Sequence, residues 1–183
     1  CSFCHGQIIA LGIGTYYGAS FMLAPFFVFW RSFMKVEYGT SLDIESWMEL
    51  VQSVSWNFPG LETEAAIEDH RKTVLRFMSE NRALCVKDDK KVVGVLLLSK
   101  KHNMICCLAV APEYRRNGIA SALLEKALTE LDSSRDITVT TFRDNDEKGI
   151  APRALYKRFG FAEEKLMIEN DYPVQRFVLR GSL

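Results

Sequence analysis

Two kinds of hydrophobic spacing alternate along the chain, and their order predicts its secondary structure. Short apolar runs typical of strands cover residues 36–38, 83–86, 92–99, 104–110, 137–142, 164–168 and 176–179. Apolar positions recur every three to four residues, as in helices that bury one face, over residues 42–53, 63–80, 119–131 and 152–159. The predicted order is β, α, α, β, β, β, α, β, α, β, β. This order indicates an α/β protein whose helices and strands share a core.

Residues at the ends of the helical segments support three of these boundaries. Ser41 precedes the first helical segment and is a residue type that caps helix N-termini. Pro152 suits the first turn of the last helix, and Gly160 suits its end.

The N-terminal segment does not fit this pattern. Residues 8–30 contain no charged side chain and are long enough to cross a bilayer as a helix. Arg31 and Lys35 follow, and the positive-inside rule would then leave the rest of the chain in the cytoplasm. The chain begins with Cys, and Met34 stands two residues before the first predicted strand. We expect residues 1–33 to be foreign to a domain that covers residues 34–183. A membrane anchor and an extra packed element are the alternatives.

Composition narrows the class of protein. The chain has 183 residues, 48% of them hydrophobic and 25% charged, with a formal net charge of zero. These values fit one globular domain, and they argue against a general nucleic-acid binder, which is usually basic.

The five cysteines do not suggest a disulfide framework. Cys106 and Cys107 are adjacent on a predicted strand, so they should point to opposite faces. Buried free thiols indicate a reducing compartment, and we expect a cytoplasmic protein. Cys1, Cys4 and His5 lack a second pair of ligands at zinc spacing, so no metal site is expected.

The most informative segment follows the apolar run at residues 104–110. Pro112 ends the run, Arg115 and Arg116 form a basic turn, and a helix begins just after Gly118. The first N–H groups of a helix lack intrahelical partners and lie at the positive end of its dipole. A strand, basic turn and helix in this order therefore predict a phosphate-binding site.

The residues Arg115-Arg116-Asn117-Gly118-Ile119-Ala120 resemble the pyrophosphate-binding motif of the GNAT superfamily of acetyl-CoA-dependent N-acetyltransferases. The resemblance implies a GNAT-like mixed, twisted sheet with helices on both faces. It also implies that the strand at 104–110 splays from the strand at 137–142 to admit the pantetheine arm, with the oxyanion met by a backbone N–H at or near Val110. The implied contacts of acetyl-CoA, a co-substrate, are Leu108, Ala109, Val110, Arg115, Arg116, Asn117, Gly118, Ile119, Ala120 and Ser121.

A second motif of the same family matches residues 154–161, in which Tyr156 stands four residues before a Gly-Phe pair. The resemblance makes Tyr156 the general acid that protonates the leaving thiolate. The alternative is a structural tyrosine whose ring packs on the sheet with its hydroxyl at the rim.

The chain departs from the family in two places. Many relatives carry Asn where this chain has Gly149, and Asn145 in the preceding loop is a candidate replacement. Many also carry a Glu on the strand before the phosphate motif, but residues 103–110 contain no carboxylate. The general base is therefore unassigned: Glu62, Glu64 or a water chain are candidates, and the amine can also arrive neutral.

The resemblance to the GNAT superfamily also implies that the acceptor site is lined by the first two helices and their connecting loop. Residues 36–69 contain eight acids and no Lys or Arg, which would attract a cationic amine or simply form a solvated surface. Trp56 and Phe58 are candidates for an aromatic wall or for the core. His70 and His102 are predicted to be exposed.

These observations favour a cytoplasmic GNAT-type N-acetyltransferase that moves acetyl directly from acetyl-CoA to a primary amine. The acceptor is a small molecule or a peptide, no nucleic acid is expected, and a homodimer is possible. One alternative is a non-catalytic acetyl-CoA sensor or adaptor. The other is a membrane-tethered interaction protein, in which residues 8–30 matter most.

Overall fold

The computed structural model describes residues 35–182 of the chain. The expectations for residues 1–33, namely the apolar segment and the Cys1, Cys4 and His5 group, lie outside the described residues. Within residues 35–182 no helix is both long and apolar enough to span a bilayer, and no cluster of three potential metal ligands occurs.

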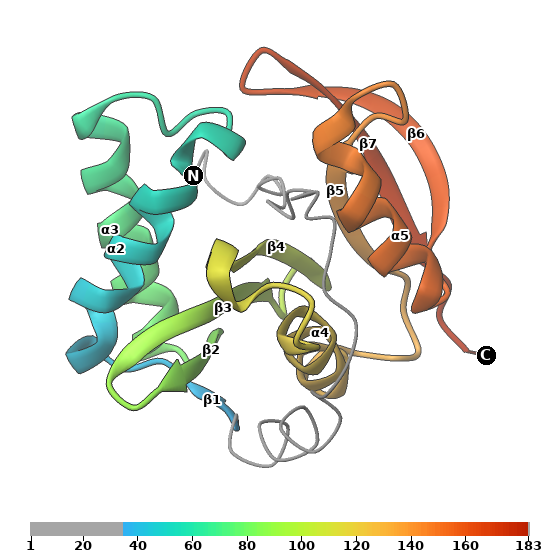
Figure 1. Ribbon diagram of the computed structural model, residues 1–183. Helices are drawn as coiled ribbons and strands as arrows, with labels where there is room; N and C mark the ends of the chain where they lie inside the picture. The colour runs from blue at the N-terminus through green and yellow to red at the C-terminus, as the bar shows by residue number, and fades with distance from the viewer. Residues whose placement is uncertain (1–34, 183) are drawn as a thin grey trace, which may run out of the picture.

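Seven strands and four α-helices, with short 3₁₀ turns, make up the described part of the chain (Figure 1). The strands are β1 (Val36–Tyr38), β2 (Ala83–Asp88), β3 (Lys91–Ser99), β4 (Met104–Val110), β5 (Ile137–Phe142), β6 (Ala162–Glu169) and β7 (Tyr172–Leu179). The helices are α2 (Ile44–Val54), α3 (Glu64–Ser79), α4 (Ile119–Glu130) and α5 (Ile150–Arg158). The predicted order of elements is confirmed, and the last two strands are longer than predicted.

The strands form one mixed sheet in the order β1-β2-β3-β4-β5-β7-β6. One face of β2–β4 packs with α2 and α3 on a core that includes Trp47 and Phe77. The other face packs with α4 and α5 on a second core that includes Leu123 and Tyr156. Figure 1 shows α2 and α3 on one side of strands β2–β4, and it shows α5, β5, β6 and β7 together in the other half of the molecule. The α/β class and the helices on both faces are as predicted.

The two halves of the sheet join at a fork between β4 and β5. These parallel strands pair only at Met104 with Thr138 and Ile105 with Val139. Beyond this point they part, and the remainder of β4 pairs with β3 alone. The splay that the resemblance implied is therefore present, and it leaves one edge of residues 106–110 unpaired with β5.

A β-bulge at the fork corrects one sequence prediction. Leu97 pairs with Cys107 and Leu98 pairs with Ile105, so Cys106 is an extra residue in β4. An extra residue interrupts the alternation of side chains. Cys106 and Cys107 consequently both lie in the core beneath α2 and α3, not on opposite faces. Cys85 and Cys107 are buried free thiols, as expected.

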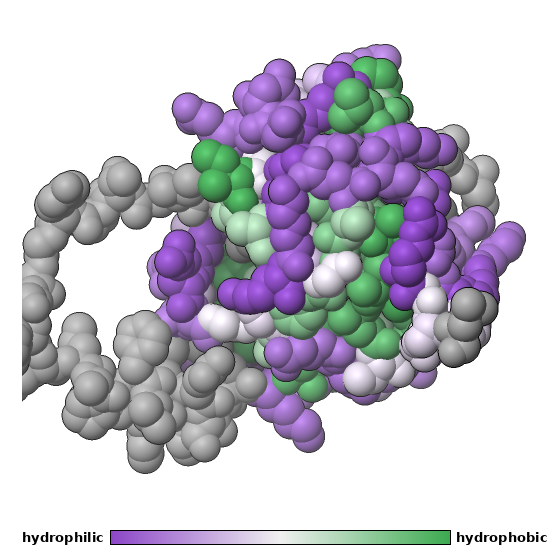
Figure 2. Space-filling model, turned by 90° about the vertical axis from the view of Figure 1, so that its right-hand side faces the viewer, coloured by the Kyte–Doolittle hydropathy of each residue, from purple (hydrophilic) through white to green (hydrophobic). Residues whose placement is uncertain are grey.

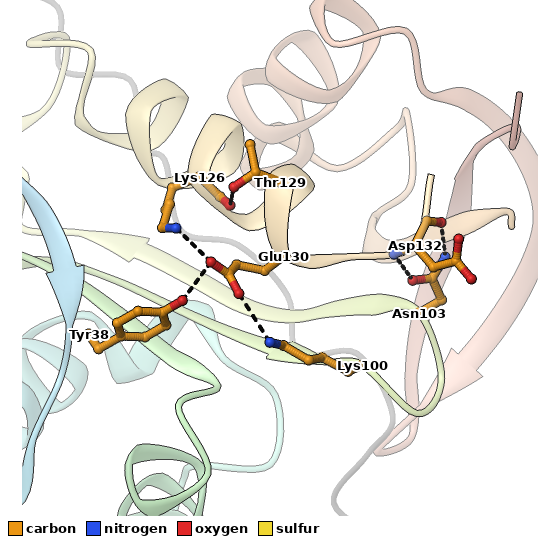
Figure 3. Close-up of polar contacts among 7 residues, drawn as sticks. All are labelled: Tyr38, Lys100, Asn103, Lys126, Thr129, Glu130 and Asp132. Atoms are coloured by element: carbon orange, nitrogen blue, oxygen red, sulfur yellow. Dashed lines mark hydrogen bonds and ion pairs between the residues drawn. The ribbon is translucent and has the colours of Figure 1, made fainter. Parts of the chain in front are cut away.

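The closed end of the fork is held by Asn103, drawn in Figure 3. Its side-chain amide donates to the carbonyls of Asp132, Arg135 and Asp136 at 2.9–3.2 Å, and its amide oxygen accepts from the Asp132 N–H at 2.9 Å. Its backbone carbonyl accepts from the Thr138 N–H at 3.1 Å. One buried residue thus ties the turn before β4 to the start of β5.

A cluster of polar side chains around Glu130, also drawn in Figure 3, holds the C-terminal end of α4 in place. The Glu130 carboxylate accepts from the Tyr38 hydroxyl at 2.5 Å, from Lys126 Nζ at 2.6 Å and from Lys100 Nζ at 3.0 Å. These bonds lower the pKa of Glu130 to about 2. They join β1, α4 and the turn after β3.

Two further predictions were wrong. The helical region at 41–54 begins with a capping box in which Thr40, not Ser41, pairs with Asp43. His70 is buried rather than exposed, because it lies on the inner face of α3 with Val74 and Phe77. His102 is exposed as predicted.

The outer edge of the sheet is β6, on the side of the molecule shown in Figure 2. Apolar surface is visible there among polar side chains, and Leu166 and Ile168 of β6 are exposed. The homodimer stays a prediction.

Candidate active site

The phosphate motif forms the turn into α4, at the open end of the fork. Gly118 is the N-cap of α4 and has φ +82°, a left-handed conformation that glycine adopts without steric cost. Arg116 also has a positive φ, at +67°. The turn therefore presents the first N–H groups of a 12-residue helix to the fork.

A glycine on β3 sets how closely α4 approaches the sheet. A Cβ on Gly94 would lie 2.5 Å from Ile119 Cγ2, a distance that real side chains do not tolerate. Gly94 also pairs with Val110, the last residue of β4. The start of α4 is thus seated directly against the strands that form the fork.

The arginines of the motif are placed differently. Arg115 lies partly buried along the end of β4, where its Nε donates to the Val110 carbonyl at 3.2 Å. Its Nη2 is buried without a hydrogen-bond partner among the described residues, and burial lowers the pKa of its guanidinium. Arg116 is exposed. Asn117 closes the turn by donating to the Tyr114 carbonyl at 3.2 Å.

Ser121, on the first turn of α4, leads to a residue that the sequence analysis missed. Its hydroxyl accepts from Arg158 Nη2 at 2.5 Å, which brings the C-terminal turn of α5 to the N-terminus of α4. A third arginine therefore lies at the predicted phosphate site. Position 158 adjoins the Tyr156 motif, but only tertiary packing shows that its side chain reaches Ser121.

Tyr156 is fully buried between α5 and the sheet, so the alternative of a structural tyrosine with its hydroxyl at the rim does not describe this structure. Its ring packs on Phe161 and Phe177, with centroids 5.5 and 6.1 Å away. Its hydroxyl has no hydrogen-bond partner within residues 35–182. Burial, and secondarily the nearby Cys107, raise its pKa well above the usual value for tyrosine. A protonated phenol without a partner is thus held near the diverging part of β4.

Thr141 supplies a second unpartnered hydroxyl near the fork. It lies two residues beyond the last β5 residue that pairs with β4, and its buried Oγ1 finds no partner in the described part of the chain. Residues two apart on a strand share a face, so Thr141 lies with Val139 on the α5 side of the sheet. A buried polar atom usually has a partner, so these two hydroxyls and Arg115 Nη2 fit an extended polar ligand that carries phosphate at one end. Coenzyme A has this shape and chemistry.

The structure separates the four residues proposed for the acceptor side. Phe58 belongs to the core beneath α2 and α3, whereas Trp56 is 62% exposed. Glu62 is exposed and accepts from the Gly60 N–H at 2.8 and 3.0 Å. Glu64 is exposed on the first turn of α3. These residues do not form a common cluster.

Basic residues from outside the segment offset half of the acids in residues 36–69. Lys87 pairs with Glu37 and Asp43 at 2.5 and 2.9 Å. Arg71 pairs with Glu45, and Lys72 pairs with Asp69. The remaining acids are Glu49, Glu62, Glu64 and Glu68, so any steering field for cations is weaker than the sequence suggested.

The loop after β5 explains Gly149 and places Asn145. A Cβ on Gly149 would lie 2.7 Å from the Arg143 carbonyl, so the closely packed backbone excludes Asn at this position. Asn145 lines an open hollow of about 420 Å³ with Arg143, Asp146, Glu147, Lys148, Tyr172 and Pro173. The hollow lies at the C-terminal end of β5, beside the open end of the fork.

Comparison with known proteins agrees with this geometry. Residues 45–161 match the model of the acetyltransferase (GNAT) family. No curated protein matches the chain significantly. Among solved structures, a GNAT-family acetyltransferase from Bacillus cereus is 19% identical with a TM-score of 0.64, over 82% of this chain and 99% of its own.

Two other similar structures have more specific names. The PaiA N-acetyltransferase of Thermoplasma acidophilum, in complex with coenzyme A, is 16% identical with a TM-score of 0.58, over 78% of this chain and 97% of its own. The ribosomal-protein-S18-alanine N-acetyltransferase of Escherichia coli is 18% identical with a TM-score of 0.62, over 82% of this chain and 95% of its own. At these identities the likeness extends to the fold alone.

Proposed function

The chain belongs to the GNAT acetyltransferase family, and from this premise we propose that it transfers acetyl from acetyl-CoA directly to a primary amine, with Tyr156 as general acid. The observation that carries the proposal is the buried Tyr156 hydroxyl, unpartnered among the described residues and close to the fork. Acetyl-CoA supplies the acetyl group as a thioester. The named residues bind it, orient it and move a proton.

Binding is assigned to the turn into α4 and to the unpaired edge of β4. The N–H groups of residues 118–121 and the side chains of Arg115, Arg116 and Arg158 would hold the pyrophosphate. The backbone of Leu108, Ala109 and Val110 would pair with the amides of the pantetheine arm, and an N–H at or near Val110 would stabilise the oxyanion.

Tyr156 is suited to donate a proton. Its raised pKa keeps the phenol protonated at neutral pH, and its surroundings offer the hydroxyl no competing acceptor within residues 35–182. A thiolate that forms within reach would be the natural acceptor of this proton, and its protonation prevents the reverse attack.

The acceptor is proposed to be a small-molecule or peptide amine. Glu49, Glu62, Glu64 and Glu68, which form no ion pair within residues 35–182, favour a cation over a neutral molecule, but only modestly. Release of CoA can be measured with a panel of alkylamines, polyamines, amino-acid amides and peptides. Release above the rate of hydrolysis with at least one amine is expected, and release with none would favour the acetyl-CoA sensor.

Tyr156→Phe tests the acid. The ring and its contacts with Phe161 and Phe177 remain, and only the hydroxyl is lost. The turnover number should fall about 10²- to 10⁴-fold, which is the usual loss for a general acid. Affinity for acetyl-CoA, measured by calorimetry, should change little. A variant with the parent's turnover number under conditions where chemistry limits the rate would exclude this role.

A further inference from the structure

Two carboxylates are buried within residues 35–182, those of Asp43 and Glu169. Asp43 has a structural explanation, because it accepts from Thr40 in a capping box and pairs with Lys87. Glu169 is the last residue of β6, and its Oε1 accepts from the Thr140 hydroxyl at 3.2 Å. Glu169 has no part in the phosphate site or in the acid step proposed for Tyr156.

Thr140 locates the Glu169 carboxylate at the fork. It is the first residue of β5 beyond the last pair with β4, which joins Ile105 to Val139. The carboxylate bonded to its hydroxyl therefore lies where the strands begin to part.

The same carboxylate lies on the α2 and α3 side of the sheet. Val139 of β5 and Ile105 of β4 share the core with α4 and α5. Thr140 alternates with Val139 and so faces away from that core. Tyr156 approaches the fork from the α5 side, whereas Glu169 approaches from the opposite side.

The β6–β7 hairpin connects this position to the expected acceptor side. Its two-residue turn, Asn170 and Asp171, has φ of +47° and +59°. Asn170 Nδ2 donates to the Pro59 carbonyl at 3.2 Å, in the loop between α2 and α3. Glu169 directly precedes this bridge, and the residue paired with it, Tyr172, lines the open hollow at the end of β5.

We propose that Glu169 binds the ammonium group of the acceptor and takes its proton, acting as the general base that the sequence left unassigned. The inference rests on the proposed acetyl transfer. It follows from a buried carboxylate at the fork, on the face opposite the acid. The substrate class is a primary alkylamine that is protonated in solution, with a pKa of about 10.4.

The protons and bonds balance. The ammonium gives one proton to Glu169, and the free amine then forms a C–N bond with the acetyl carbon as the C–S bond breaks. The nitrogen loses a second proton on becoming an amide. Tyr156 protonates the sulfur and is itself reprotonated from solvent, which also takes up the nitrogen's second proton. Glu169 releases its proton to solvent, so one proton is set free for each acetyl group transferred.

Charged and titratable groups on the elements that adjoin β6 come from β7 and from the loop after β5. Arg176 lies across from Thr140 and pairs with Glu164 at 3.0 Å. The Tyr172 hydroxyl donates to Asp146 at 2.7 Å. Arg143 donates to the carbonyls of Met167 and Val174, and Lys148 lies over the rings of Phe142 and Tyr172.

The first test measures binding without turnover. The full chain is labelled with ¹³C at the glutamate side-chain carboxyl carbon, and the Glu169 signal is identified by its loss in Glu169→Gln. Addition of n-butylammonium to the CoA-loaded protein should shift this signal in a saturable way, and n-butanol should not. The Glu164 signal, identified from Glu164→Gln on the same strand, should stay in place. An unmoved Glu169 signal would overturn the proposal.

The second test is the pH dependence of kcat/KM with the best amine of the panel. In the parent enzyme Glu169 can deprotonate bound ammonium, so kcat/KM should be nearly flat over about pH 7–9. In Glu169→Gln only free amine reacts, so kcat/KM should rise about tenfold per pH unit towards the amine pKa near 10.4. The loss at pH 7 should be about 10²- to 10⁴-fold. Glu164→Gln should follow the parent.

The outcomes separate this inference from the proposed function. A uniform loss of kcat/KM in Glu169→Gln at every pH, with a lowered melting temperature, would indicate a structural role and contradict the general-base role. Should the parent enzyme transfer acetyl to no amine, the acetyl-transfer proposal fails together with the base step. The ¹³C signal would still decide whether Glu169 binds an ammonium group.

Discussion

Individual residues at this site owe their roles to burial and to missing partners. Tyr156 and Arg115 were both named from motifs, but the buried, unpartnered atoms they carry became visible only in the fold. Arg158 gained a role because it contacts Ser121. The same kind of observation singles out His70, whose two ring nitrogens are buried with no hydrogen-bond partner among the described residues.

Arg158 gives a sharper test of the phosphate site than Gly118, whose left-handed backbone would be strained by any side chain. Arg158→Gln should weaken CoA binding by about 10-fold or more, since hydrogen bonds to charged groups contribute about 1.5–3 kcal/mol. Calorimetry at two salt concentrations would show a smaller salt dependence in the variant. Lys157→Gln is the matched control, because Lys157 pairs with Glu163 on β6 instead. Equal losses of CoA affinity in both variants would contradict a specific contact between Arg158 and CoA.

His70 should make stability depend on pH in a defined window. Burial lowers its pKa from 6.5 to about 4. The unfolded chain therefore binds the proton first, and stability that is complete above pH 6.5 is lost as the pH falls towards 4. The loss should reach about 3 kcal/mol by pH 4, at 1.36 kcal/mol for each unit of pKa.

The measurement is urea unfolding of the parent and of His70→Leu between pH 4 and 7.5. The variant lacks the imidazole, so the difference between the two should grow in its favour as the pH falls. Parallel curves would show that His70 titrates normally in the folded protein.

At the scale of elements, the fork depends on a contrast between its two ends. The closed end is held by Asn103 and by the two pairs between β4 and β5. The open end is shaped by the bulge at Cys106, by Gly94 under α4 and by the left-handed turn at Gly118. Strands that are joined at one end and parted at the other leave backbone groups for a ligand without separating the halves of the sheet.

Asn103→Gly tests the closed end. The residue has φ +51°, which glycine adopts freely, so the substitution removes the side-chain bonds without adding strain. Stability should fall by about 2–4 kcal/mol, because buried carbonyls lose their donor. Asn81→Gly is the control, since the exposed Asn81 has the same φ of 51°. Chemical denaturation should show a small change in Asn81→Gly and a large one in Asn103→Gly. Equal effects would contradict the assigned role.

At the scale of the whole molecule, the hairpin tip and the loop between α2 and α3 meet across the fork through Asn170 and Pro59. The proposed acceptor side thus draws on segments more than 100 residues apart. The proposed acid reaches the fork from one face of the sheet and the proposed base from the other. Such an arrangement suits a direct transfer, in which amine and thioester are held together in one site.

The domain boundary proposed at residue 34 makes a prediction at this scale. A chain that begins at Met34 contains every predicted strand and helix, so it should unfold cooperatively and bind acetyl-CoA. Acetyl-CoA should raise its melting temperature, because a ligand that binds only the folded state stabilises it. Differential scanning calorimetry of the shortened and the complete chain would compare the two. Aggregation or non-cooperative unfolding of the shortened chain would show that residues 1–33 belong to the domain.

The sequence by itself determined the order of the elements, the α/β class and the position of the turn that is proposed to bind phosphate. These features rest on local periodicity and on short motifs such as residues 115–120, which act within a few residues. The tertiary structure alone decided the bulge that turns Cys106 and Cys107 to one face, the burial of His70 and the ion pairs of the acids in residues 36–69. It also brought Arg158 to Ser121 and Glu169 to Thr140. Burial and contact join residues far apart in the chain, and no local pattern records which of them will meet.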